Sequence, residues 1–416
     1  MNQILSFILF FPFVVFGQNL FNVNIDSNEK FDGNLFYRVT GPGVKTVSIL
    51  DNNFNSVFTE NWGPKGGDFK INYNNKLSYF DRTSKGWFIM DSLMNEIDSV
   101  YCKNGYIADN HDFLALENGN YVIFAYDQQI YAMDTVIPGG DPNAMVEGLI
   151  LQELDSNHNL IFEWKSWDHF HVTDNVYLAP WTGSSLAFIH TNAIDLDFDN
   201  HFLISSRNLD EITKIHRTSG EIIWRWGGSK SDFTFTNDYP FTHQHSIQSL
   251  GNNRYLLFDN GNHSSQFTGK SNFSRAVEYE LDTVLMTANK VWEFVHPDSL
   301  YTPTISSVQR LPNGNTLIDF GNLQSMGRGS LVVEVNSNNQ ILFEIEFNNG
   351  CNLYRAKKFN WSFFTPSNID NYNTSDFSKN IISTIDLHGR KIQSNINIPF
   401  IKIFDDGTVE KRIVID

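Results

Sequence analysis

Three histidines in this sequence stand at the same position of a repeated pattern. His111, His190 and His245 each open a stretch that reads as a strand, a turn built on Asn, Gly or Asp, and a second strand; Ser306 takes this position in the next copy. A single histidine is most often a surface residue or a satisfied polar residue. Three in register favour a shared site, because equivalent positions of repeats arranged around an axis converge.

Arg207 completes a set suited to moving a charged group. It lies in "LISSRN", at the far end of the hairpin that starts with His190. Its guanidinium is a planar fork that matches a tetrahedral oxyanion, although a solvated arginine is the alternative. One neutral imidazole can attack, a second can protonate the leaving oxygen, and the third can bind the transferred group with the arginine. The set indicates a sulfate or phosphate site.

Other ligands fit these residues less well. Three histidines can hold zinc, but the charge of Arg207 would repel the ion, and no short-spaced His or Cys motif anchors such a site. The sequence also has no Walker-type phosphate loop and no nucleotide-binding glycine pattern. We therefore expect no metal and no cofactor.

Two interleaved hairpin repeats must position the set. The inner repeat is the one that carries the histidines. The outer repeat runs from a hydrophobic strand through a turn into an aromatic-rich strand, at 45–62, 87–101, 149–166, 212–228, 276–297 and 331–347. Two hairpins per period are typical of four-stranded propeller blades. We predict a six-bladed β-propeller, with weaker inner strands at Asn34–Val39 and Lys76–Phe80 and with Tyr354–Phe363 closing the ring. A large β-sandwich would not explain the alternation.

The composition agrees with one large all-β domain. Of 416 residues, 14% are aromatic and 19% charged, and the apolar runs are short and end in Asn, Gly or Asp. The net charge of −17 argues against nucleic acid or anionic lipid as a partner. An anionic substrate must therefore be attracted by a local cluster of donors. Cys102 and Cys351 are the only cysteines, and a disulfide and two free thiols are equally compatible with the sequence.

Both ends of the chain differ from the part between them. The apolar run Ile4–Gly17 is too short to cross a bilayer and suits a signal peptide at 1–17, with a buried first strand as the alternative. The propeller is expected at 18–366, and the Asn- and Ser-rich stretch 367–382 reads as a linker. In 383–416, "DLHGRKI", "DDG" and a terminal "KRIVI" resemble the C-terminal sorting domain of the type IX secretion system of Bacteroidetes. A small appended β domain is the alternative. This resemblance implies a secreted or cell-surface protein that is exported by the type IX machinery.

Four motifs carry a second resemblance. They are "SSRN…TKI…TSGEIIWRWGG", "HQHSIQ…LLFDNG", "NHDFLALENGNYVIF" and "SVQRLPNGNTLIDFG". With them, most of 104–347 resembles the bacterial arylsulfotransferases. The family implies a six-bladed propeller that moves a sulfuryl group from an aryl sulfate to a phenol through a sulfated histidine, without PAPS. In the matching motifs the nucleophile falls on His245 and the sulfate-binding arginine on Arg207; two further active-site histidines fall on His190 and His111.

The nucleophile must attack as the neutral imidazole. An ordinary pKa of about 6.5 predicts that the rate falls in acid. His243 also lies near the nucleophile position in "HQHSIQ", but the register with the other two histidines selects His245.

Five further residues are candidates for binding the substrate. Trp167 and His171, in "EWKSWDHFHV", are expected in a loop that lines the site, with packing between blades as the alternative. His243 adjoins the nucleophile. His263 and Arg275 follow "FDNGN" and are expected at the mouth of the site.

Three functions remain open at this point. The first is a sulfuryl transferase that acts on phenolic acceptors. The second is an aryl sulfate hydrolase, which needs the same residues and passes the group to water. The third is a non-catalytic propeller that binds at the surface, since propellers host many functions. The complete set of three histidines and one arginine favours an enzyme.

Overall fold

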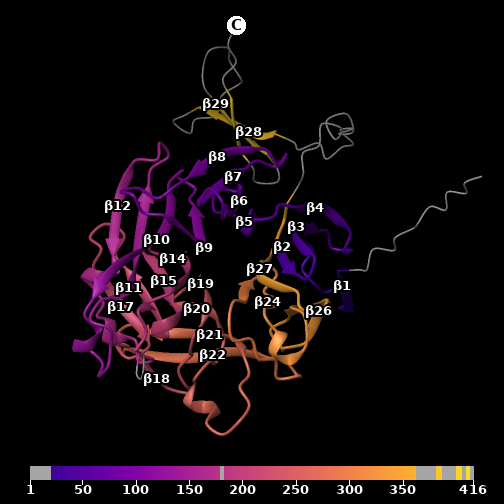
Figure 1. The fold of residues 1–416 in the computed structure, drawn as a ribbon. Helices are drawn as coiled ribbons and strands as arrows, with labels where there is room; N and C mark the ends of the chain where they lie inside the picture. The colour runs from indigo at the N-terminus through magenta and orange to yellow at the C-terminus, as the bar shows by residue number, and fades with distance from the viewer. Residues whose placement is uncertain (1–19, 179–181, 362–380, 387–399, 405–408, 413–416) are drawn as a thin grey trace, which may run out of the picture. The chain divides into compact units, whose positions relative to one another are not determined.

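The computed structural model describes residues 20–178, 182–361, 381–386, 400–404 and 409–412, and nearly all regular structure in them is β-strand (Figure 1). The all-β class is confirmed. The chain divides into two units, residues 1–362 and 363–416. The predicted signal peptide at 1–17 and most of the predicted linker at 367–382 lie outside the described residues.

The first unit holds six antiparallel sheets, and each is a blade. The first three blades, from the axis outward, are β27 (Asn352–Phe359), β2 (Asn34–Gly41), β3 (Val44–Leu50) and β4 (Ser56–Asn61); β5 (Gly67–Ile71), β6 (Leu77–Asp81), β7 (Gly86–Met90) and β8 (Glu96–Val100); and β9 (Ala108–Ala115), β10 (Tyr121–Tyr131), β11 (Ala144–Leu154) and β12 (Leu160–Lys165), with β13 (Ser185–Ala187) parallel to β11.

The other three blades follow the same order. They are β14 (Thr191–Leu196), β15 (Phe202–Ser206), β16 (Glu211–Ile215) and β17 (Ile222–Gly227); β19 (His245–Gly251), β20 (Arg254–Asp259), β21 (Arg275–Asp282), β22 (Thr287–Val295) and β18 (Thr234–Phe235); and β23 (Ser307–Arg310), β24 (Thr316–Phe320), β25 (Leu331–Val335), β26 (Ile341–Phe347) and β1 (Phe21–Asp26). Each innermost strand contacts those of both neighbouring blades, so the ring is closed and the six-bladed prediction is confirmed.

The first two blades differ in detail from the prediction. The stretches expected to be inner strands are β2 and β6, which are the second strands of their blades; the innermost strands are β27 and β5. Both innermost strands contain Lys or Arg residues, so their hydrophobic pattern is weak. The strand β27 closes the ring as expected: it pairs with β2, with Tyr37 opposite Ala356, and Figure 1 shows the two strands side by side.

Aromatic side chains fill the space between neighbouring blades. Trp87 of the second blade stacks on Phe113 of the third with 5.1 Å between ring centroids. Phe258 of the fifth blade meets the edge of Phe320 of the sixth at 5.5 Å. Burial of one such side chain contributes about 1.5–3 kcal/mol, so these layers hold the blades in the positions that the inner strands require.

The two cysteines are both free: Cys102 is partly buried and Cys351 is buried. Of the two possibilities that the sequence left open, the structure has the unpaired one. None of the helices in the described ranges is long and apolar enough to span a membrane.

The second unit contains one antiparallel sheet in its described residues, made of β28 (Ile381–Asp386), β29 (Phe400–Phe404) and β30 (Val409–Arg412). The strands β29 and β30 lie within 383–416, the segment whose motifs resemble a sorting domain. The strand β28 begins at Ile381, inside the stretch 367–382 that was expected to be a linker. The rest of the proposed sorting segment at 383–416 lies outside the described residues.

Candidate active site

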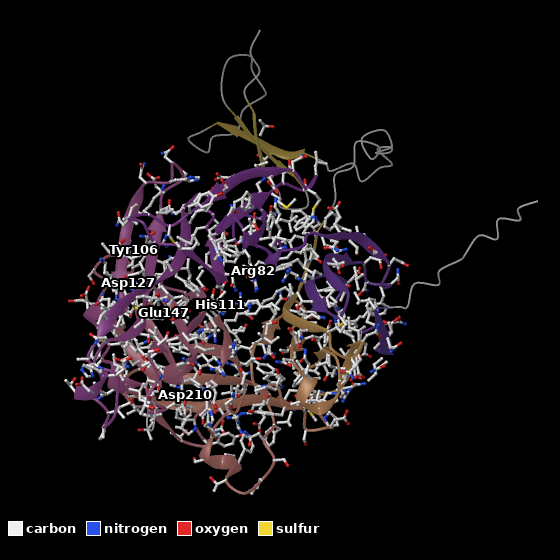
Figure 2. All side chains as sticks on the ribbon, viewed as in Figure 1. Arg82, Tyr106, His111, Asp127, Glu147 and Asp210 are labelled. Atoms are coloured by element: carbon white, nitrogen blue, oxygen red, sulfur yellow. The ribbon has the colours of Figure 1, made fainter. Side chains whose placement is uncertain are left out.

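The three histidines in register lie on the innermost strands of three consecutive blades. His111 is in β9, His190 directly precedes β14, and His245 is the first residue of β19. The rings of His111 and His190 meet edge to face with 4.8 Å between centroids. Figure 2 shows His111 toward the middle of the ring of blades. Both residues lie near enough to His245 to disfavour its protonation, so the repeat brings the three imidazoles together.

The neighbours of His245 fix its tautomer. Its Nδ1 lies 2.7 Å from Oδ1 of Asn260. The amide nitrogen of Asn260 donates to the carbonyl oxygens of Thr302, at 2.7 Å, and Ile305, at 3.2 Å, which sets the orientation of the amide. Because an amide oxygen only accepts, Nδ1 of His245 carries the proton and the lone pair is on Nε2. A neutral imidazole of this tautomer is a nucleophile at Nε2.

Burial keeps this imidazole neutral. His245 is 4% exposed, and burial lowers its pKa well below the ordinary value. The charge of Arg207, and those of His190 and His111, lower this pKa further, while the hydrogen bond to Asn260 raises it. The expectation that the nucleophile titrates near its ordinary pKa is therefore wrong.

The other two histidines have different surroundings. Burial, with the charges of His111 and Arg207, lowers the pKa of His190 to about 3. His190 also has a left-handed backbone, with φ of 45°, a conformation that stores strain and is found at functional sites. His111 hydrogen-bonds through Nδ1 to the carboxylate of Asp109, which also accepts from its backbone N–H at 2.8 Å. Of the three histidines in register, His111 is thus the one that hydrogen-bonds a carboxylate.

Arg207 follows β15 and faces the histidines without an ion-pair partner. Its Nη1 donates to Oδ1 of Asn208 at 3.0 Å and its Nη2 to the carbonyl oxygen of Pro303 at 3.2 Å. Its backbone N–H donates to the carbonyl oxygen of His190 at 3.0 Å, which ties it to the site. Burial lowers the pKa of its guanidinium. Within the described ranges no carboxylate forms a salt bridge with it, so a partly buried positive charge is left for an anionic ligand.

The buried Arg275 shows what Arg207 lacks. Arg275 pairs with Asp238, Asp259 and Glu293, each at 2.9 Å. A buried charge is usually paired because an unpaired one is costly. The absence of a carboxylate at Arg207 therefore distinguishes an anion-binding arginine from a structural one.

A family comparison agrees with this geometry. The model of the family described as "Arylsulfotransferase (ASST)" matches residues 27–355, which is most of the chain. The chain belongs to the arylsulfotransferase family. Membership supports an arylsulfotransferase enzyme with an aryl sulfate as donor and a phenol as acceptor.

Comparisons with individual proteins add little. No curated protein matches the chain. A protein of unknown function from Bacteroides caccae matches with a TM-score of 0.49 and 13% identity over 79% of this chain and 99% of its own. Virginiamycin B lyase from Staphylococcus aureus matches with a TM-score of 0.38 and 9% identity over 94% of this chain and 98% of its own. Similarities at this level do not bear on function.

Beneath the histidines, this member of the arylsulfotransferase family has a buried ion network. Arg355 of β27 lies 3.0 Å from a carboxylate oxygen of both Asp68 and Asp112. Lys70 of β5 pairs with the same two carboxylates, at 2.8 Å from Asp68. Arg355 also donates to the carbonyl oxygen of Asn192 at 2.7 Å. The network joins the inner strands of the first four blades and forms a rigid base for His111 and His190.

His243 belongs to a second cluster. Its backbone N–H donates to Oδ1 of Asp210 at 2.6 Å, and its Nδ1 lies 3.1 Å from the same oxygen. Its ring lies 4.7 Å from that of Tyr177 and 5.2 Å from that of His263, centroid to centroid. The Tyr177 hydroxyl donates to Asp210. The charge of Arg207 acts on His243, so His243 and the exposed His263 adjoin the site, while His245 holds the tautomer expected of the nucleophile.

Three other candidates lie elsewhere. Arg275 does not reach the mouth: it is 1% exposed and its charge is balanced by three carboxylates. Trp167 packs on Tyr131 and Phe188, with centroids 6.4 and 5.3 Å away. The exposed His171 accepts from the backbone N–H of Thr173 at 3.3 Å and caps a short 3-10 helix. All three have structural contacts, and Trp167 packs on Tyr131 of its own blade.

Two residues of the site were not among the predicted ones. Asn260 orients His245, and Asp109 holds His111. A sequence signal for Asn260 exists: it directly follows β20, as Arg207 directly follows β15, so the two occupy equivalent positions in neighbouring blades. Asp109 lies two residues before His111, on the same face of β9. Across the described part of the chain, no three His, Cys, Asp or Glu side chains are grouped as metal ligands.

Proposed function

We propose that the protein transfers a sulfuryl group from an aryl sulfate to a phenolic acceptor, without PAPS, through a sulfohistidine at Nε2 of His245. The observation that carries the proposal is a buried imidazole with its lone pair on Nε2 beside the guanidinium of Arg207, which is partly buried and forms no salt bridge in the described ranges. These are the nucleophile and the anion-binding group that sulfuryl transfer requires.

In the first half-reaction, Nε2 of His245 attacks sulfur and the bond from sulfur to the aryl oxygen breaks. Arg207 and the N–H of neutral His190 bind the sulfuryl oxygens, whose charge grows in the transition state. His111, with Asp109 on its Nδ1, gives a proton to the departing phenoxide. The products are a free phenol and an N-sulfonated His245, whose Nδ1–H remains hydrogen-bonded to Asn260.

In the second half-reaction, a phenolic acceptor enters the site and its oxygen attacks sulfur. The nitrogen–sulfur bond breaks and the electron pair returns to Nε2 of His245. His111, which lost its proton in the first step, takes the proton of the acceptor. A covalent intermediate of this kind splits one displacement into two and gives ping-pong kinetics.

The test uses a chromogenic aryl sulfate with and without an added phenol. Without acceptor, one sulfuryl group should remain on the peptide that contains His243 and His245, and mass spectrometry locates it. Replacement His245→Ala should remove burst release of phenol and lower turnover by about 10⁴ or more. A burst that persists in this variant contradicts the assignment. Release of sulfate at the same rate with and without phenol would identify the protein as a hydrolase. Absence of any reaction with aryl sulfates would favour a non-catalytic binding propeller.

We also propose that the protein is exported to the cell surface or the medium. The support is the apolar run in 1–17 and the sorting-like motifs in 383–416. Expression in a host with type IX secretion, with and without residues 383–416, tests it. Retention of the shortened chain inside the cell, with export of the full chain, is the expected result.

A further inference from the structure

A cavity of 560 Å³ beside the histidines is lined by positive charge. Its lining includes Arg38, Lys45, Arg82 and Arg355, and Asp68 is the one acidic residue of the described lining. Asn110 and Tyr354 also line it. Asn110 precedes His111 in β9, and the ring of Tyr354 lies 5.7 Å from that of His111, centroid to centroid. The cavity therefore adjoins the proposed reaction centre.

Three of the four cations have no carboxylate partner. Arg38 donates through Nε to the carbonyl oxygen of Lys65 at 3.0 Å and through Nη2 to that of Gly63 at 2.9 Å, which leaves its Nη1 without a partner. Lys45 and Arg82 are exposed, and neither forms a salt bridge in the described ranges. Arg355, by contrast, is balanced by its ion network.

Like charges gather here although the chain is strongly acidic, with a net charge of −17. Burial lowers the pKa of the Arg38 guanidinium, and the positive charge of Arg82 lowers it further. Two guanidinium groups that repel each other, in a cavity, are relieved when an anion binds between them. The arrangement is costly when empty and favourable when an anion occupies it.

A second cavity of 560 Å³, next to the first, has the opposite charge. It shares Asn110 with the first and is lined by Asp109, Asp127 and Glu147 against one cation, Lys85. Figure 2 shows Arg82 and His111 near the middle of the ring, with Asp127 and Glu147 over the third blade. An anion would be repelled by the second cavity and attracted by the first. Charge alone therefore sets the direction in which an anionic substrate can extend from the histidines.

We propose that the cavity of Arg38 and Arg82 selects aromatic substrates that carry a second anionic group, of the carboxylate class, on the ring or on a short arm. The inference rests on the proposed function, in which the reacting oxygen is placed at the histidines. The phenol ring then lies between the reaction centre and the two guanidinium groups, and the carboxylate is bound by their free N–H groups.

The test compares two acceptors that differ only in charge: hydroxyphenylpropionate and its primary amide, with nitrophenyl sulfate as the fixed donor. Wild-type protein should prefer the acid in kcat/KM. Arg82→Gln should lower the ratio of acid to amide by about tenfold, as loss of a charge-assisted hydrogen bond does. Arg82→Glu should reverse the preference. Lys85→Gln is the matched control, because it removes one exposed cation from the other cavity and should leave the ratio unchanged.

Two outcomes overturn the inference. An equal loss for acid and amide in Arg82→Gln means that the cation acts on the sulfate ester common to both reactions. An equal loss in Lys85→Gln means that only net charge matters. Arg82 is the residue chosen for substitution because its side chain is exposed, so its replacement leaves the core intact.

A binding measurement separates this inference from the proposed function. Calorimetric titration with hydroxyphenylpropionate, without donor, should give binding that Arg82→Gln weakens about tenfold. Binding of the acid without any sulfuryl transfer would support carboxylate binding in this cavity and contradict the proposed function. Equal binding of acid and amide would contradict carboxylate selection by the cavity, whatever the activity.

Discussion

At the scale of single residues, the site depends on which protons its histidines hold. Asn260 gives His245 a proton on Nδ1 and a lone pair on Nε2, and burial prevents a second proton from binding. Asp109 gives His111 a different partner, since a carboxylate oxygen rather than an amide oxygen lies beside Nδ1 of this ring. Two imidazoles of the same chemistry therefore receive different roles from one hydrogen-bond partner each.

The lowered pKa of His245 predicts an unusual pH profile. A group with a lowered pKa stays neutral as the pH falls through the ordinary value of about 6.5 and is protonated only at a lower pH. The single-turnover release of nitrophenol, without acceptor, should therefore keep its rate from pH 7 to below pH 6 and fall only in stronger acid. Nitrophenolate leaves without needing a proton, so the profile reports on the nucleophile. A midpoint near 6.5, with the fold shown intact by circular dichroism, would contradict the role of burial.

The unpaired charge of Arg207 predicts that Arg207→Lys is severe. A lysine ammonium keeps the charge but cannot present two oriented donors to a sulfuryl group. Turnover should fall by about 10²–10³, the usual loss for one oriented donor in such a site. Arg328→Lys, at an ion pair of the outer part of the sixth blade, is the control and should change turnover little. Activity within a few-fold of wild type for Arg207→Lys would place this residue outside the site.

At the scale of elements, the inner strands carry both the chemistry and the base beneath it. Asp112 of β9 pairs with Arg355 of β27 and Lys70 of β5, and its Oδ2 accepts from the backbone N–H of Ile194 in β14 at 2.9 Å. Four blades thus meet at one carboxylate. The two cations lower the pKa of Asp112 against the effect of its burial, so the charged form is the one that holds the ring together.

Replacement Asp112→Asn should destabilise the propeller. It removes one of two carboxylates that balance two buried cations, and breaking such a buried pair costs about 3–5 kcal/mol. Denaturant unfolding, followed by fluorescence, measures the change in the free energy of unfolding. Asp298→Asn, which breaks the exposed pair with Arg328, should cost at most about 1 kcal/mol. Equal effects of the two substitutions would show that the central network does not stabilise the ring.

The strands also show which parts of the fold could be predicted from the sequence. The outer hairpins were predictable because their strands are hydrophobic and their turns contain Asn and Gly. The strand β5 was not, because "GDFKI" places charged residues in a polar centre and breaks the apolar pattern. Arg275 was misplaced because closeness in sequence to "FDNGN" does not reveal that β21 is the third strand from the axis. Trp167 and His171 follow β12, the outermost strand of its blade, for the same reason.

The site itself was predictable to the extent that it repeats. Convergence of His111, His190 and His245 follows from register alone, since equivalent positions of blades meet at the axis. The role of Asn260 does not, because it depends on the direction of one amide, which two carbonyl oxygens set from another blade's loop. The register of the repeats predicts where a residue lies in the ring. Which ring nitrogen of His245 carries the proton is determined by its hydrogen-bond contacts, which the repeats do not predict.

At the scale of the whole molecule, the last strand of the first unit decides where the chain can be cut. The ring is closed by β27, which ends at Phe359 and supplies Tyr354 and Arg355 to the site. Removal of residues after Pro366 leaves this strand in place, whereas removal of residues after Cys351 deletes it. The two shortened chains differ by few residues, but the second loses the pairing with β2 and the cation that joins the inner strands.

We therefore predict that a chain ending at Pro366 folds and keeps its turnover within a few-fold of the full chain, because the first unit ends at residue 362 and has its own core. A chain ending at Cys351 should be insoluble or unfolded, because the first blade is left with an open inner edge and the network with an unbalanced pair of carboxylates. Solubility, circular dichroism and the burst of nitrophenol are measured for both chains. Unfolding of the chain that ends at Pro366 would show that residues 367–416 are needed by the propeller, and an active chain that ends at Cys351 would show that β27 is not needed to close the ring.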